Sequence, residues 1–82
     1  MSHFEVRNAI EEVKAGKNLH IHINSEFPLV REYVADQGYG LDTLVRDKDS
    51  MVRCAVAEQG YGHDILLANG ETNEKVLERI KK

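Results

Sequence analysis

One phrase of the sequence occurs twice, and it constrains the fold more than any other feature of the chain. Residues 30–45 read VREYVADQGYGLDTLV, and residues 52–67, at an offset of 22, read VRCAVAEQGYGHDILL. Ten of the sixteen aligned positions are identical. A fixed period of this size is typical of folds that stack small repeated units, because one unit alone cannot bury its apolar face.

Each copy predicts a longer helix, a glycine turn and a short helix. Apolar residues recur at helical spacing in the first part of both copies. We expect Gly38 and Gly60 to end the longer helices, and Asp42 and Asp64 to cap the short ones. A last helix near the C-terminus carries the same apolar stripe on an otherwise polar surface, as a capping repeat requires.

The N-terminal part of the chain predicts a helix and then a strand. A helix is expected over about residues 3–15, opened by a capping box at Ser2 and closed by Gly16. Residues 19–23 alternate strictly between apolar side chains and histidines, which is a half-buried strand pattern. A lone strand leaves its backbone groups unpaired. We therefore expect this segment either to run along the end of the stack or to pair with the same strand of a second chain.

The expected fold is all-α: a short α-solenoid with one extended or β segment near the N-terminus. The 82 residues are 41% hydrophobic and 30% charged, an ordinary globular balance that allows one small domain. The polar last helix favours a complete array over a fragment of a longer one. The expected parts are an N-terminal helix with its extended segment (1–24), two repeats (25–47 and 48–69) and a capping helix (70–82).

Part of the second copy resembles a known class of bacterial repeat. Residues 47–58 read DKDSMVRCAVAE. This phrase is similar to the leucine-rich repeat variant, and more loosely to HEAT repeats, which share Asp-x-Asp-x-x-Val-Arg-x-x-Val-Ala-Glu before a turn and a second helix. The resemblance covers residues 25–69 and implies an α-helical solenoid that presents a surface, with no reaction implied.

The chain also departs from that class. Its period of 22 is shorter than the family's, and Gly-Tyr-Gly stands where the variant repeats carry Asn and Pro. The iron–sulfur cluster that precedes some variant arrays needs several cysteines, whereas this chain has only Cys54. No cofactor is therefore expected.

Two pairs of repeat-equivalent residues are candidates for a binding surface. Stacking would align Arg31 with Arg53. The two arginines either form a basic ladder for an acidic partner, or make structural hydrogen bonds inside the fold. In the second case they bond acidic side chains such as Asp47 and Asp49, and the carbonyls of a neighbouring turn. Stacking would likewise align the two turn tyrosines. They either form an aromatic ridge for a peptide or another ligand, or cover the helix ends with their hydroxyls in water. The candidate ridge consists of Tyr39, Tyr61, Gln37 and Gln59.

The remaining reactive side chains give no sign of an active site. His20 and His22 form a His-x-His pair, but two ligands are too few for a metal site, and no carboxylate or cysteine is spaced to complete it. Cys54 lies inside a helix without a nearby general base. We expect neither a metal site nor an enzyme.

Composition and pattern leave three functional hypotheses. The first is a protein-interaction module that binds a protein or peptide. The second is a structural homo-oligomer, such as a homodimer, joined through residues 19–23. The third is nucleic-acid binding through Arg31 and Arg53, against which the net charge of -3 weighs. The chain has no secretory leader and no apolar run long enough to cross a membrane, so we expect a cytoplasmic protein.

Overall fold

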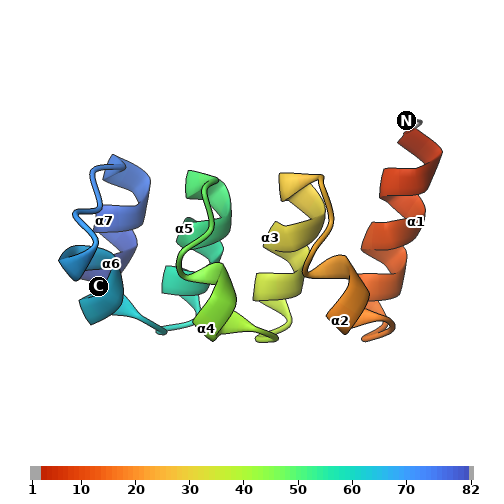
Figure 1. Cartoon of the computed structure of the whole chain (residues 1–82), viewed down its shortest axis with the longest axis horizontal. Coiled ribbons are helices and arrows are strands. Elements are labelled where there is room, and N and C mark those ends of the chain that lie inside the picture. The colour runs from red at the N-terminus through yellow and green to blue at the C-terminus, as the bar shows by residue number, and fades with distance from the viewer. Residues whose placement is uncertain (1–2, 82) are drawn as a thin grey trace.

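The longer helices stand side by side in one row (Figure 1). The computed structural model describes residues 3–81, and all regular secondary structure within that range is helical, as expected. The longer helices are α1 (His3–Lys14), α3 (Pro28–Asp36), α5 (Ser50–Glu58) and α7 (Glu74–Lys81), and each contacts the next. The short helices between them are α2 (Leu19–His22), α4 (Leu41–Leu44) and α6 (His63–Ala68).

The row consists of three units, each a longer helix, a turn and a short helix, followed by α7. The first unit is α1 with α2, the second α3 with α4, and the third α5 with α6. The longest dimension of the molecule is 35 Å. Four longer helices share that length, so neighbouring helix axes lie about 10 Å apart, which is the usual spacing of packed helices.

Valines at repeat-equivalent positions form much of the core. Val30 and Val34 of α3 are fully buried, and so are Val52 and Val56 at the same positions of α5. Burying one such side chain stabilises the fold by about 1.5–3 kcal/mol. Each apolar stripe contacts the next helix in the row, so no unit buries its core without a neighbour.

Two left-handed glycines shape each turn of the second and third units. Gly38 and Gly60 follow the longer helices with φ of 74° and 77°. Two residues later, Gly40 and Gly62 (φ 65° and 73°) are the N-caps of the short helices. The predicted aspartate caps were wrong: the left-handed glycine turns the chain directly into the helix, and no side chain caps its first turn.

The second glycine of each turn also lets consecutive units approach closely. A Cβ atom added to Gly62 would lie 2.6 Å from Cγ2 of the buried Val45, which immediately follows α4. A Cβ atom added to Gly40 would collide with Cδ1 of Ile23, which follows α2 in the same way. The ends of α2 and α4 therefore pack against the turns of the units that follow them.

The predicted strand at residues 19–23 was wrong, because these residues form α2 and its C-cap. Gly16 and Asn18 have φ of 74° and 56°, so they repeat the two left-handed positions of the later turns. Asn18 tolerates this conformation better than most residues with a side chain. The N-terminal segment is thus a diverged first unit, in which His22 stands where Leu44 and Leu66 are buried in the later units.

Helix α6 has six residues whereas α2 and α4 have four, so the cap of the longer helix that follows α6 is displaced by two residues. Asn73 caps α7 by accepting hydrogen bonds from the amides of Lys75 and Val76, as Asp49 caps α5 by accepting one from Met51. These caps are 24 residues apart rather than 22. The predicted capping box at Ser2 lies outside the described residues.

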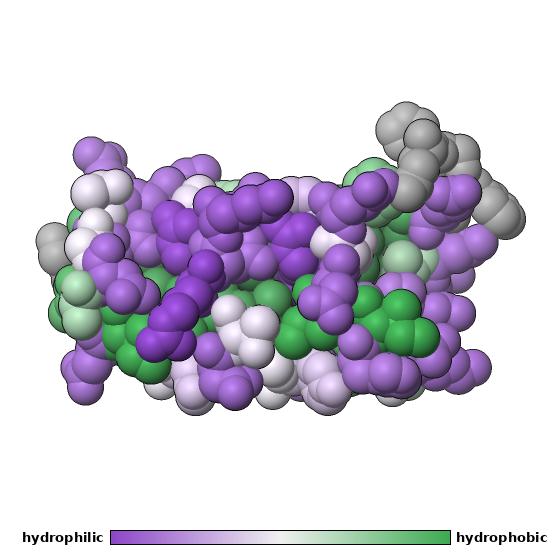
Figure 2. All heavy atoms as spheres, in the orientation of Figure 1, coloured by the Kyte–Doolittle hydropathy of each residue, from purple (hydrophilic) through white to green (hydrophobic). Residues whose placement is uncertain are grey.

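The surface divides into a polar and an apolar zone. Figure 2 shows an apolar band along one face of the molecule, at the level of the short helices. The exposed large apolar side chains of the short helices include Ile21 of α2 and Leu67 of α6. Within residues 3–81, no helix combines the length and apolar character needed to cross a bilayer.

Candidate functional site

The two predicted tyrosines lie on equivalent turns at one edge of the row. Tyr39 and Tyr61 are 39% and 36% exposed, and each is flanked by two left-handed glycines. The backbone amides of the two tyrosines donate equivalent hydrogen bonds of 3.4 Å, to the carbonyls of Val34 and Val56. The two turns therefore have the same backbone geometry, one unit apart.

A glutamine precedes each tyrosine by two residues. Gln37 and Gln59 are the C-caps of α3 and α5, and both are exposed. The side-chain amide of Gln59 donates a hydrogen bond of 3.1 Å to the carbonyl of Asp36, so it links the ends of two neighbouring helices. We call the set Gln37, Tyr39, Gln59 and Tyr61 the turn ridge.

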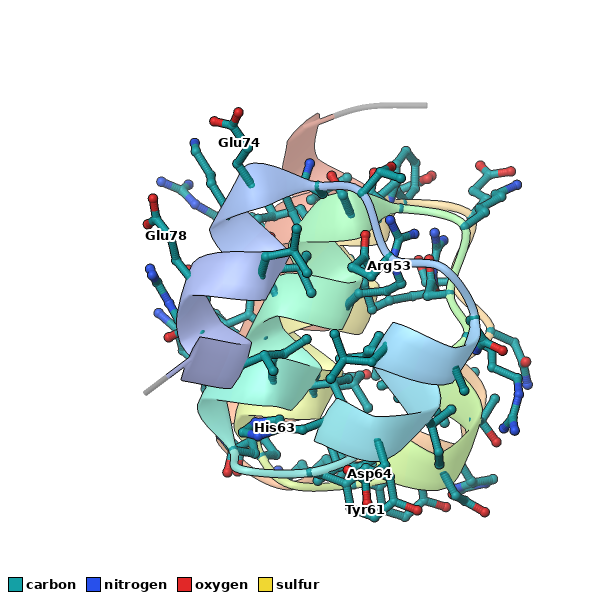
Figure 3. All side chains as sticks on the ribbon, turned by 90° about the vertical axis from the view of Figure 1, so that its left-hand side faces the viewer. Arg53, Tyr61, His63, Asp64, Glu74 and Glu78 are labelled. Atoms are coloured by element: carbon teal, nitrogen blue, oxygen red, sulfur yellow. The ribbon has the colours of Figure 1, made fainter. Side chains whose placement is uncertain are left out.

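Carboxylates accompany the turn ridge. Asp42 and Asp64 are exposed and follow the tyrosines by three residues, in the first turns of α4 and α6. Viewed along the row from the α7 end, Tyr61 and Asp64 lie at the same edge, and Arg53 lies toward the opposite edge (Figure 3). The ridge and the arginines are thus separate features of the molecule.

Arg31 makes the contacts that its structural interpretation predicts. It is 7% exposed, and its guanidinium donates to both carboxylate oxygens of Asp47, at 2.7 Å and 3.1 Å. The same guanidinium donates to the carbonyl of Ser25 at 2.6 Å. Arg31 therefore ties the loop before its own helix to the loop before the next one.

Arg53 repeats this arrangement one unit later. It donates to the two carboxylate oxygens of Glu71 at 2.6 Å and 3.0 Å, and to the carbonyl of Asp47 at 2.8 Å. Asp47 thus accepts from one arginine with its side chain and from the next with its backbone. Each arginine uses three donors inside the fold, so neither presents an unoccupied guanidinium to a partner.

These bonds shift the ionisation of the carboxylate that Arg53 contacts. The hydrogen bonds from Arg53 lower the pKa of Glu71, and the backbone amide of Asn73 acts in the same direction with a bond of 3.1 Å. Burial opposes this shift, since the Glu71 side chain is only 3% exposed. The fold therefore holds Glu71 in its charged form.

The two histidines of α2 have different surroundings. The Nε2 atom of His22 lies 2.7 Å from a carboxylate oxygen of Glu12 in α1, and this bond lowers the pKa of Glu12. His20 is exposed. Nowhere between residues 3 and 81 are three or more His, Cys, Asp or Glu side chains grouped so as to hold a metal ion.

The surface around Cys54 is acidic, which the sequence analysis did not anticipate. Cys54 is buried, and burial together with a 3.6 Å contact to Glu58 raises the pKa of its thiol. Burial also raises the pKa of Glu32 and of Asp36, and repulsion from neighbouring carboxylates adds to both shifts. The repeat could have indicated this group of carboxylates, because Asp36 and Glu58 are acidic residues at equivalent positions of the two copies.

Comparison with protein-family models, with curated proteins and with solved structures finds no match to this chain.

Proposed function

We propose that this chain is a short α-solenoid that acts as a non-enzymatic protein-interaction module. Its partner is a protein or peptide bound along the turn ridge. The row of contacting helices supports the solenoid interpretation, and so does the resemblance of residues 47–58 to leucine-rich repeat variant and HEAT repeats. An array of this kind offers an extended surface without catalytic groups.

The exposure of two equivalent tyrosines carries the proposal. Tyrosine gives a large contact area at a low cost in side-chain entropy, and it is common where proteins bind each other. Tyr39 and Tyr61 remain more than one-third exposed although the neighbouring valines are fully buried. The glycines on either side of each ring adopt the left-handed conformations of the turn, and they have no side chains that could cover the ring.

The two other hypotheses have less support. Pairing through residues 19–23 required a strand, and these residues are helical. Nucleic-acid binding required a ladder of accessible arginines, but Arg31 and Arg53 both hold internal carboxylates. A partner recognised by the turn ridge uses neither feature.

A selection from a random peptide library displayed on phage tests the proposal. The wild-type chain should enrich a sequence pattern, and the double variant Tyr39→Ala/Tyr61→Ala should fail to retain it. Met51→Ala is the matched control, because Met51 is 42% exposed and lies at the opposite end of α5 from the ridge. The proposal is refuted by the absence of any enriched pattern, or by peptides that bind the tyrosine double variant as well as the wild type.

A further inference from the structure

We infer that the segment recognised by the turn ridge is a polyproline II helix that carries a Lys or Arg side chain. This inference rests on the proposed function and names the class of partner. It follows from three properties of the ridge: the spacing of its two turns, its glutamine side chains, and the sign of the charge near its tyrosines.

The distance between the rings matches the repeat of a polyproline II helix. Tyr39 and Tyr61 occupy the same position in neighbouring units, so they are displaced by the helix spacing of about 10 Å. A polyproline II helix has three residues per turn and rises about 9 Å per turn, so residues i and i+3 on one face reach consecutive rings. In a β-strand, residues on one face are about 7 Å or about 13 Å apart, and neither spacing fits.

The polar groups of the ridge distinguish this helix from an α-helix. An α-helix also presents one face about every 10 Å, at i and i+7, but it binds by laying an apolar stripe into an apolar groove. The ridge instead has exposed glutamines two residues before each ring, and the Gln59 amide, which donates one N–H to the carbonyl of Asp36, has a second N–H. The carbonyls of a polyproline II helix make no internal hydrogen bonds, so they are available to accept from such donors.

The charge beside the rings selects a basic ligand. The exposed Asp42 and Asp64 follow the rings by three residues, and residues 36–42 and 58–64 contain no Lys or Arg. Glu58, in the same stretch, is paired with Arg79 at 3.4 Å. A cation placed next to a tyrosine ring gains from the ring face as well as from the carboxylate. In the first unit, Lys17 stands at the tyrosine position and His20 at the position of Asp42, so the acidic part of the ridge is confined to the second and third units.

Binding of a designed peptide tests the inference. The probe is a labelled 12-residue peptide that repeats Pro-x-x-Pro and carries two arginines; its control keeps the arginines and replaces every proline with glycine. Fluorescence anisotropy should show roughly tenfold weaker binding for the glycine peptide, since it must be ordered on binding, and roughly tenfold weaker binding of the probe to Tyr61→Ala. Met51→Ala should bind the probe like the wild type.

Amide shifts in the ¹⁵N spectrum of the unmodified wild-type chain give a second measurement that does not depend on the folding of a variant. The probe should shift the amides of residues 37–42 and 59–64. Equal affinity for the proline and glycine peptides, shifts confined to other residues, or no binding of the probe would each overturn the inference.

The library selection separates this inference from the proposed function. Tyrosine-dependent peptides that lack prolines three residues apart would leave an interaction module at the ridge and overturn the polyproline II partner. The absence of tyrosine-dependent peptides would overturn both. Enrichment of basic peptides with prolines at i and i+3 would support both.

Discussion

Substituting Gly62 with alanine tests whether consecutive units meet at this turn, and Gly60 supplies the control. Both glycines have left-handed backbones, with φ of 73° and 77°. A Cβ atom at position 62 would lie 2.6 Å from Cγ2 of Val45, whereas a Cβ atom at position 60 has nothing within 4 Å. The two substitutions therefore differ mainly in whether the preceding unit is in the way.

The expected free-energy changes follow from this difference. A left-handed alanine costs about 1–2 kcal/mol. The loss of glycine's freedom in the unfolded chain offsets about 0.4–1 kcal/mol of this cost. Gly60→Ala should therefore reduce the free energy of unfolding by about 1 kcal/mol. Gly62→Ala should cost about 1–3 kcal/mol more, because Val45 is fully buried and cannot move aside.

Urea unfolding followed by far-UV circular dichroism measures both free energies. In a Val45→Ala background, where the methyl group that meets the new Cβ atom is absent, the cost of Gly62→Ala should fall to about that of Gly60→Ala. Equal costs for the two single substitutions would refute the argument that the Val45 side chain packs on this turn. So would an undiminished cost of Gly62→Ala in the Val45→Ala background.

Two further predictions concern the ion pair between Arg53 and Glu71. Arg53→Ala should reduce the free energy of unfolding by about 3 kcal/mol in urea, because it leaves the carboxylate of Glu71 buried without its cation. The control is Arg79→Ala, which breaks a more exposed ion pair with Glu58. It should cost less than about 1 kcal/mol. A smaller loss for Arg53→Ala than for Arg79→Ala would contradict this assignment. The folded state lowers the pKa of Glu71, so its contribution to stability is complete above the unfolded-state pKa of about 4.3 and is lost as the pH falls through the folded-state value. Glu71→Gln should therefore flatten the decline in stability below about pH 4.5, and an unchanged decline would contradict the predicted role of this carboxylate.

The repeat made much of the fold predictable. Identical residues at a fixed offset located the longer helices, the left-handed glycines and the buried valines, because stacked units impose the same environment on equivalent positions. The alternation of residues 19–23 misled the prediction, since a four-residue helix is too short to display a helical period. The better signal was the pair Gly16 and Leu19, which repeats Gly38 and Leu41 at the offset of 22.

The candidate site was predictable to a similar extent. The positions of Tyr39 and Tyr61 on turns followed from the glycines around them, and Asp47 was among the carboxylates expected for the arginines. Glu71 was missed because the period points to Asn69, two residues earlier, and only the structure reveals that α6 is two residues longer than α4. The bond between Glu12 and His22 joins two elements of the diverged first unit, where no repeat offered guidance.

The side chain of Asn18 makes the two ends of the row differ in how they could accept a further unit. Gly40 and Gly62 leave room for the end of the preceding short helix. Asn18 occupies the equivalent position and carries a Cβ atom. A further unit stacked before Asn18 in the same register would therefore collide with this Cβ atom. Leu67, the counterpart of the fully buried Val45, is 53% exposed, so it offers apolar surface to an inserted turn. A duplication of residues 46–67 is therefore accommodated inside the array and not ahead of it, and each added copy lengthens the molecule by about 10 Å.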